Sequence, residues 1–482
     1  MKIDAIEEAP PGAFHRKLLI ACCGGPLLDG YLLSIVGVAL TDMTRDLALS
    51  GSTAALIGVA AIVGMFFGGL LIGPLTDVIG RRAMYTIDLA VLLGASAASV
   101  VTTEPWQIIA LRFVIGFAIG ADYPIATALL TEWSPRRQRG RALGWVIMAW
   151  YLGALAAYLV GYLIAVAIPA GGWRWMLASS AVLSVIVLVL RHGTPESPRW
   201  LIERGRIDEA RELIRSVLGK DVGREQLLAA RTTGIRHGSV RALFRGIYLR
   251  RLLFVSLFYT CQVIPMWAIY IFGPKLLGAF GFDEVTVGTV GSALVSLLFL
   301  AGCVPAMRLL ETVGRRPMIT WSFALMAVPL LVLGLWQDAP VVVVLGCFSA
   351  YAFFAGAPGI LEWLYPNELF PTSIRATAVG LVVALSKIGA AVGTYLVPTS
   401  LEHFGVSGTM CAGAAITVVG LVACLAWAEE TRGRTLEDAS LDASDSAASG
   451  PDSGTGTGTG TGPGTGPDSG TGKDRPSADP VR

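Results

Sequence analysis

Four ionisable side chains interrupt long apolar stretches of this 482-residue chain. Asp29, Arg112, Asp122 and Lys387 each stand in a run of about 20 mostly apolar residues, which is the length that crosses the hydrocarbon of a bilayer. A charge inside a membrane is costly, so it marks a functional site by default. A buried acid binds a proton readily unless a cation opposes it. The four residues therefore predict proton handling and ion recognition inside a membrane protein.

Depth along the predicted helices separates these residues. At 1.5 Å per residue, Asp29 and Lys387 each lie roughly 16 Å into their runs, near the midplane. Asp122 precedes Pro124, so a structural hydrogen bond beside a kink is an equal alternative to proton handling. Arg112 is only about six residues inside its run and can instead extend to the outer surface. Lys387 can balance an acid or receive an anionic substrate.

The elements that must hold these residues are helices that span a membrane. The chain is 54% hydrophobic and 15% charged, well away from the balance of soluble proteins. Its apolar runs form two sets of six and predict an all-α membrane protein with twelve transmembrane helices. We place the runs at 17–40, 54–75, 84–103, 106–130, 142–166, 173–190, 252–275, 286–309, 318–336, 340–361, 377–399 and 407–427.

Three motifs recur at nearly the same offset, about 234 residues. Residues 77–82 return at 311–316, and residues 132–144 return at 368–380. A glutamate and a hydroxyl residue ahead of an arginine occur in 195–199 and again in 429–432. A shared offset indicates a duplicated unit. Two membrane halves related in this way are typical of transporters that rock around a central site.

The repeated motifs place acids and arginines at the ends of helices. Gly80 and Gly314 permit tight turns, and the neighbouring Asp77 and Glu311 can pair with arginines in directional contacts. Such pairs can latch one side of the protein in one conformational state; the alternative is that the arginines only anchor topology. The predicted gating residues are Asp77, Gly80, Arg81, Arg82, Glu132, Arg139, Glu196, Glu311, Gly314, Arg315, Arg316, Glu368, Arg375 and Glu430.

Charge in the loops predicts orientation and domain organisation. Arginines gather in alternate loops, and Lys and Arg concentrate on the cytoplasmic side of membrane proteins, so we expect both termini there. We divide the chain into an N-terminal six-helix half (1–190), a cytoplasmic linker with short amphipathic helices (191–251) and a C-terminal six-helix half (252–437). The Gly/Thr-rich tail (438–482) is too polar to offset its ordering entropy and is expected to be disordered.

The motifs together resemble the major facilitator superfamily, in its branch of sugar porters and metabolite:proton symporters. The resemblance covers about residues 18 to 437. It rests on 73–82, on Arg112-x3-Gly116-x3-Gly120, on 195–201, on 368–375 and on 430–436. The stretches 29–31 and 120–124 are most similar to bacterial metabolite transporters and also to phosphate:proton symporters.

The resemblance implies roles for the intramembrane charges. In related proton-coupled porters the acid that matches Asp29 lies near the arginine that matches Arg112, so protonation of Asp29 would release Arg112. Asp122 matches an acid that handles protons in the phosphate symporters. Asp88 and Glu362 lie close to the cytoplasmic interface, and we interpret them as structural.

The expected substrate differs from a hexose. Sugar porters carry a Gln-Gln pair and a following Asn in the seventh span, where this chain has Cys261-Gln262 and Trp267. Fewer paired donors and acceptors suit a small organic acid or an amphipathic metabolite better than a polyol. The aromatic residues can instead serve only for packing. The candidate substrate-binding residues are Tyr31, Tyr123, Trp150, Tyr259, Gln262, Trp267, Trp363 and Lys387.

We therefore expect a secondary active transporter of the cell membrane that moves a small polar metabolite, an organic acid or a sugar-like molecule, by alternating access with protons. The alternatives are an uncoupled facilitator, in which Asp29 is dispensable, and a non-transporting sensor of the same fold. No nucleophile–base pattern or nucleotide-binding loop indicates an enzyme. The expected partners are the lipid bilayer, the substrate and protons, without nucleic acid, metal or cofactor, and the protein is expected to be a monomer.

Overall fold

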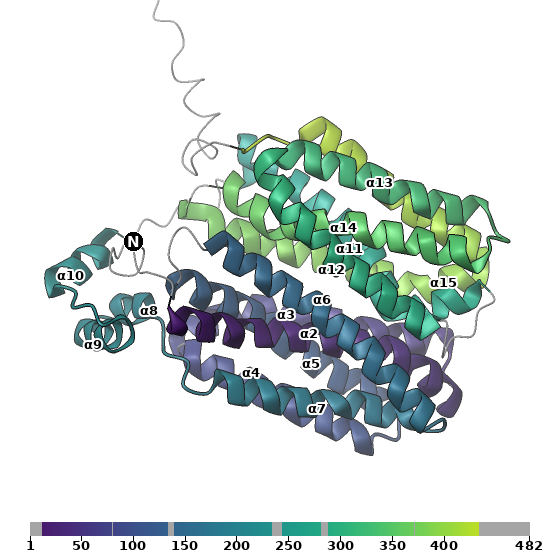
Figure 1. The fold of residues 1–482 in the computed structure, drawn as a ribbon, viewed down its shortest axis with the longest axis horizontal. Coiled ribbons are helices and arrows are strands. Elements are labelled where there is room, and N and C mark those ends of the chain that lie inside the picture. Colours follow the sequence, from purple (N-terminus) through teal and green to yellow (C-terminus); the bar gives the residue numbers. More distant parts are fainter. Residues whose placement is uncertain are drawn as a thin grey trace, which may run out of the picture. The chain divides into compact units, whose positions relative to one another are not determined.

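The computed structural model describes residues 12–79, 81–133, 139–233, 243–280, 288–370 and 372–432, and within these ranges the regular elements are all helices. The first half supplies α2 (Ala13–Asp46), α3 (Gly51–Ile79), α4 (Arg81–Ala98), the 3-10 turn η1 (Ser99–Val101), α5 (Pro105–Trp133), α6 (Arg139–Ala167) and α7 (Gly172–Arg191). The second half supplies α11 (Gly246–Ala279), α12 (Thr289–Thr312), α13 (Arg315–Leu335), α14 (Val341–Leu369) and α15 (Thr372–Trp427). These long helices lie alongside one another (Figure 1).

Every apolar run in the sequence falls largely within one of these helices, so the all-α membrane fold is confirmed. Ten of the described helices are long and apolar enough to cross a membrane. The last two predicted spans share α15, which bends at Gly405, where φ is 66°. In α5 the described apolar stretch is the shorter Pro105–Gly120. Counting α5 and both limbs of α15 gives the twelve predicted crossings; that number, and the sidedness of the termini, stay predictions.

Three short helices connect the halves: α8 (Pro198–Glu203), α9 (Ile207–Leu218) and α10 (Arg224–Thr233). In α9 the apolar Ile207, Ala210 and Ile214 are buried, at a spacing that places them on one face of a helix. They pack into a small core with residues of α8 and α10. Gly219 ends α9 in the left-handed conformation that favours glycine.

Glycines bring equivalent helix pairs of the two halves into close contact. A Cβ on Gly116 of α5 would lie 1.9 Å from the carbonyl oxygen of Ala61 in α3. In the second half, a Cβ on Gly302 of α12 would lie 2.0 Å from the carbonyl oxygen of Phe353 in α14. Small residues at helix crossings are the usual means of tight packing in membranes, where apolar burial gives no driving force between helices.

The two halves also contact each other within the described residues. The Tyr158 hydroxyl in α6 donates to the carbonyl oxygen of Tyr270 in α11 at 2.6 Å. A Cβ on Gly37 of α2 would lie 2.8 Å from the carbonyl oxygen of Ile271, also in α11. The functional side chains described below therefore lie on helices that belong to one packed unit.

The glycine contacts generate a prediction about stability. Gly116→Ala places a methyl group against backbone, which cannot move aside as a side chain can, so we expect a loss of about 1–3 kcal/mol and a lower unfolding temperature in detergent. The matched control is Gly94→Ala in α4, where an added Cβ meets nothing within 4 Å. Equal unfolding temperatures for the two variants would show that the α3–α5 contact is not tight.

Candidate functional site

One face of α2 carries the central acid. Gly25, Asp29 and Leu32 follow at steps of four and three residues, so they lie along one stripe of the helix. Asp29 is 1% exposed, and neither of its carboxylate oxygens has a hydrogen-bond partner within the described residues. It lies within electrostatic reach of Asp122, Arg191 and Lys387. Asp29 is thus a buried acid without a direct partner.

Arg112 of α5 contacts α2 further along this stripe, but it is not paired with Asp29 in this structure. Its Nη1 donates to the carbonyl oxygen of Leu32 at 2.7 Å, and its Nε and Nη2 lack partners among the described groups. Leu32 is about one turn beyond Asp29. The expected contact between the side chains of Asp29 and Arg112 is therefore absent here, although both lie at the same segment of α2. Arg112 is buried and does not extend to the outer surface.

Asp122 is paired with a cation that the sequence analysis did not identify. Arg191, the last residue of α7, contacts Asp122 Oδ1 at 2.7 Å and donates to Oδ2 at 2.9 Å. Both side chains are buried. The contact packs against Gly25, where an added Cβ would lie 1.7 Å from Asp122 Oδ2. Asp122 therefore lies one turn from Asp29 along α2, and its interaction is an ion pair rather than a hydrogen bond beside Pro124.

Lys387 lies opposite, in the C-terminal half. Its Nζ is 5.0 Å from the centre of the Trp267 ring, and it is within electrostatic reach of Glu362 and Asp29. Glu362 is buried and is held within hydrogen-bonding reach of Tyr259. No ion pair shorter than 4 Å to Lys387 occurs in the part of the chain that the structure describes. Lys387 thus connects an acid of its own half with the central acid of the other.

Two aromatic pairs include or accompany the tryptophan that faces this lysine. Trp150 of α6 meets Trp267 of α11 edge to face, with ring centres 5.9 Å apart. Tyr259 meets Trp363 in the same way at 6.3 Å. Gln262 Oε1 and Trp267 Nε1 are buried without hydrogen-bond partners in the described structure. The predicted substrate residues from both halves therefore meet here and leave polar atoms available to a ligand.

Another predicted substrate residue, Tyr31, makes its contact elsewhere. The Tyr31 hydroxyl shares a 2.6 Å hydrogen bond with Ser179 of α7, so Tyr31 contacts another helix of its own half. The side chain of Tyr123 lies outside the described part of the chain. The same holds for Gly80 and for the side chains of the gating candidates Asp77, Arg81, Arg82, Glu132, Arg139, Glu311 and Arg375, whose roles stay predictions.

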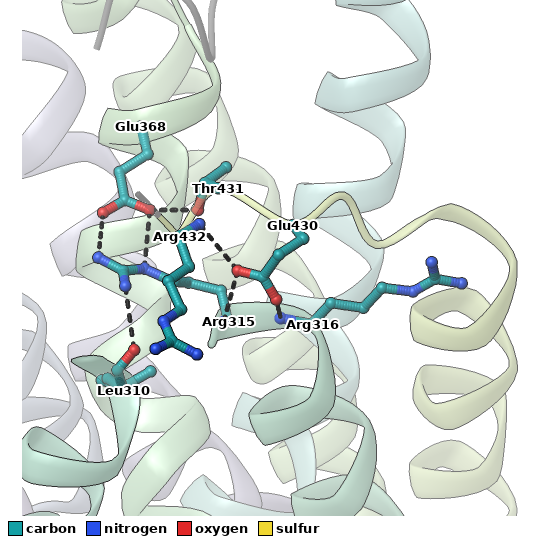
Figure 2. Close-up of polar contacts among 7 residues, drawn as sticks. All are labelled: Leu310, Arg315, Arg316, Glu368, Glu430, Thr431 and Arg432. Carbon is teal, nitrogen blue, oxygen red and sulfur yellow. Dashed lines mark hydrogen bonds and ion pairs between the residues drawn. The ribbon is translucent and has the colours of Figure 1, made fainter. Parts of the chain in front are cut away.

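Four of the remaining gating candidates meet with Thr431 in a C-terminal latch: Arg315, Arg316, Glu368 and Glu430 (Figure 2). Gly314, which precedes Arg315, packs against Glu430 of this latch. Arg315 binds Glu368 with two hydrogen bonds of 2.8 and 3.2 Å. Thr431 donates to the same carboxylate at 2.5 Å. The latch therefore joins the start of α13, the end of α14 and the segment after α15.

Glu430 caps α13 in this latch. Its carboxylate accepts the backbone N–H groups of Arg315 at 3.0 Å and Arg316 at 3.1 Å, which suits the positive end of a helix dipole. Gly314 has φ +105°, and a Cβ there would lie 2.6 Å from Glu430. The predicted need for glycine at this turn thus has two causes, the backbone conformation and the space for the carboxylate.

A second contact beside the latch was not anticipated from the sequence. Arg251, near the start of α11, binds Glu429 with its Nη2 2.6 Å from Oε2 and donates to the carbonyl oxygen of Leu369 at 2.9 Å. The Tyr365 hydroxyl accepts the Glu429 N–H at 2.7 Å.

The gating candidate Glu196 lies in the first half, where its backbone carbonyl accepts a hydrogen bond from the Trp133 ring N–H at 3.3 Å.

The structure shows buried charges whose neighbours the sequence analysis did not identify. Glu362 and Asp88 were interpreted as structural because they lie close to the cytoplasmic interface, and both are buried and face other charges. Arg191 was not singled out because it follows the last apolar residue of its run. The signal that could have found it is its position directly at the end of an apolar run.

The latch generates a prediction about local stability. Burial raises the pKa of Glu430, but the N–H groups of Arg315, Arg432 and Arg316 and the charge of Arg315 outweigh it and hold that pKa below its usual range. Glu430→Gln removes the charge from the cap at a cost of about 1 kcal/mol. We expect faster amide hydrogen exchange in the first turn of α13, with no change in α4. Unchanged exchange in α13 would contradict the assignment of Glu430 as its cap.

Comparison with known proteins identifies the family of this chain. The family described as Sugar (and other) transporter matches residues 17–442. The chain is 42% identical to the putative metabolite transport protein YaaU of Escherichia coli, over 89% of this chain and 95% of that protein. It is 28% identical to the niacin transporter NiaP of Acinetobacter baylyi, over 91% and 99% of the two chains.

The fold is similar to a solved transporter structure. The partially occluded inward-open xylose transporter XylE of E. coli superimposes with a TM-score of 0.76 at 22% identity, over 88% of this chain and 100% of that one. The family match spans both halves and all the long helices described above. The chain therefore belongs to the sugar (and other) transporter family of the major facilitator superfamily, and it is a multi-pass transporter of the cell membrane, not an enzyme.

Proposed function

We propose that this transporter carries a small organic acid together with protons. The observation that supports this most is the placement of Asp29 and Lys387, one in each half and within electrostatic reach of each other. Asp29 has no hydrogen-bond partner and Lys387 no close ion pair in the described structure. The two halves thus present a carboxylic acid and a lysine cation at their boundary, neither of them in a close ion pair among the described residues.

This pair couples proton binding to anion binding. While Asp29 is ionised, it competes with a substrate carboxylate for the charge of Lys387. A proton on Asp29 removes that competitor, and the substrate anion in turn no longer faces the negative charge of Asp29. Each ligand therefore increases the affinity for the other, and this reciprocity is required thermodynamically. The loaded site carries a proton and an anion, whose charges cancel, and crosses the membrane at a lower electrostatic cost.

The surrounding groups favour a carboxylate on a flat or ring-shaped body. Trp150 and Trp267 offer aromatic faces beside the lysine, and Gln262 Oε1 and Trp267 Nε1 can bind a polar edge of the substrate. A hexose requires more paired donors and acceptors than this group supplies. The relative NiaP is a niacin transporter, and niacin is a ring carboxylate. Nicotinate is therefore a suitable first test substrate.

The uncoupled facilitator is the alternative from which this proposal must be distinguished. It retains the aromatic group and Lys387, but requires no exchange of protons at Asp29. The burial of Asp29 away from water and from a direct cation favours coupling, because such a group changes its protonation when its surroundings change.

The first prediction from this proposal tests the coupling of transport to protons. Asp29→Asn mimics the protonated acid permanently, so proteoliposomes with this variant should lose nicotinate accumulation driven by a pH gradient. They should keep at least part of the exchange between nicotinate-loaded sides. Glu104→Gln, which removes an exposed acid outside the bundle, serves as control and should behave as wild type. Accumulation at the wild-type rate in Asp29→Asn would favour the facilitator.

The second prediction tests the anion site. Lys387→Gln removes a charge-assisted contact worth about 1.5–3 kcal/mol, so the apparent affinity for nicotinate should fall at least tenfold. The affinity for nicotinamide, which has the same ring without the negative charge, should change little. Lys17→Gln removes an exposed lysine and should leave both affinities unchanged. Parallel losses for nicotinate and nicotinamide would contradict the role of Lys387 as the carboxylate ligand.

A further inference from the structure

A second group of charges lies about one turn of α2 from Asp29, at Gly25, and the mechanism above does not use it. Arg191 binds Asp122 as described, and its Nη1 is also 3.7 Å from Oδ1 of Asp88 in α4. The guanidinium stacks on the ring of Tyr85 at 3.4 Å and donates to the Tyr85 carbonyl oxygen at 3.3 Å. One arginine from α7 thus faces two acids, from α4 and α5, and all three side chains are buried.

The charges of this group do not balance. One guanidinium can neutralise one carboxylate, yet Asp88 and Asp122 both face it, and Asp29 feels the charge of both acids. The second oxygen of Asp88 is buried without a hydrogen-bond partner in the described structure. A buried carboxylate that lacks its own cation is expensive, and acids that share a site hold protons jointly rather than singly. The geometry therefore favours the binding of one proton by this group.

The placement of the group connects it to Asp29. The ion pair of Asp122 and Arg191 packs on Gly25, four residues before Asp29 on the same face of α2. That separation is about 6 Å along the helix, which one bridging water can span. The other ionisable groups that face the cluster are Cys22 and Tyr85. Lys387 is within electrostatic reach of Asp29 but not of Asp88 or Asp122.

We propose that Asp88, Asp122 and Arg191 form a second proton site that receives the proton of Asp29 and releases it toward the end of α4 that bears Arg81. The proposal rests on the proposed function and names the exit of its proton. Asp29 in its acid form gives its proton to the carboxylate pair and becomes an anion. The pair, held by Arg191, changes from sharing no proton to sharing one. Asp88, seven residues from the start of α4, then gives the proton to water.

Arg191 has a definite task in this sequence. Its charge lowers the cost of the anionic state of the pair, so that the proton can leave again. Without a cation the two acids would retain their proton permanently. Arg191 ends α7, and its carbonyl oxygen accepts the Thr194 hydroxyl at 2.7 Å, so the arginine is held at a fixed helix end. Arg191 is thus a positioning residue and does not itself exchange a proton.

The test measures the proton directly and needs no substrate. Infrared difference spectra of the purified full-length transporter in liposomes, recorded between alkaline and acidic pH, show the C=O signal of protonated carboxyl groups. We expect Asp88→Asn and Asp122→Asn each to remove or displace one and the same signal, because the proton is shared. If Asp88→Asn leaves the carboxyl signals of wild type unchanged, Asp88 takes no part in holding the proton, and the proposal is overturned.

A variant without any change of charge keeps the test decisive if an Asn variant does not fold. Gly25→Ala inserts a methyl group between Asp122 and Arg191, which would approach to 1.7 and 1.9 Å of the new Cβ. It should shift the shared carboxyl signal, whereas Gly94→Ala, in open space on α4, should not. Asp88→Glu, which retains the acid, should shift the signal without removing it. Spectra identical to wild type for both Gly25→Ala and Asp88→Glu would contradict the proposal.

The link to Asp29 has its own readout. Removal of the negative charge in Asp29→Asn makes the pair bind its proton less tightly, so the midpoint of the shared signal should move to lower pH. An unmoved midpoint would overturn the transfer between the two sites. Because these measurements contain no nicotinate, they stand apart from the transport assays: a shared proton in a protein that does not carry nicotinate would support this inference and contradict only the proposed substrate.

Discussion

The arrangement of this transporter depends on one constraint: a charge held away from water must be paired or must bind a proton. The described residues meet this constraint unevenly. Asp122 has Arg191, and Glu362 has Lys387 and Tyr259 nearby, but Asp29 has no direct partner. Arg112 satisfies one nitrogen on the carbonyl of Leu32 and leaves two others unpaired. Asp29 lies on α2 and Arg112 of α5 contacts the same helix one turn away, so the cost of leaving these groups unpaired is concentrated where protonation or a ligand can relieve it.

Close helix packing makes this concentration possible. Gly30 and Gly153 let α2 and α6 approach until an added Cβ would meet backbone at 2.0 and 1.8 Å, and Gly25 leaves room for the pair of Asp122 and Arg191. A side chain at any of these positions would move the acids apart or admit water between them. Glycine therefore acts here less through conformational freedom than through absent volume. Small residues in the sequence of α2 are as much a part of the electrostatic design as the charges are.

How far the sequence could predict this structure follows from the same physics. The spans were predictable because their length and apolar composition are set by the bilayer. The duplicated motifs singled out Arg315, Glu368 and Glu430 as gating candidates, but they did not predict that Glu430 caps α13 or that Arg315 pairs with Glu368. The facing of side chains was not predictable. Helices that are apolar on all sides carry little amphipathic signal, so nothing in the sequence indicated that Arg191 would reach Asp122, 69 positions away, or that Arg112 would bond a carbonyl instead of Asp29. The two last predicted spans correspond to the two limbs of α15, which meet at Gly405, where the backbone is not helical.

The latch and the buried charges respond differently to acid. Glu430 has a lowered pKa, so its contribution to stability is complete at neutral pH and is lost only as the pH falls through that lowered value. A modest pH gradient across a membrane therefore leaves the C-terminal latch intact. Asp29 is in a different situation, because it is buried without a direct partner in the described structure. In the proposed mechanism the response to a proton gradient therefore belongs to the bundle interior, and the latch responds only after the interior charges change their pairing.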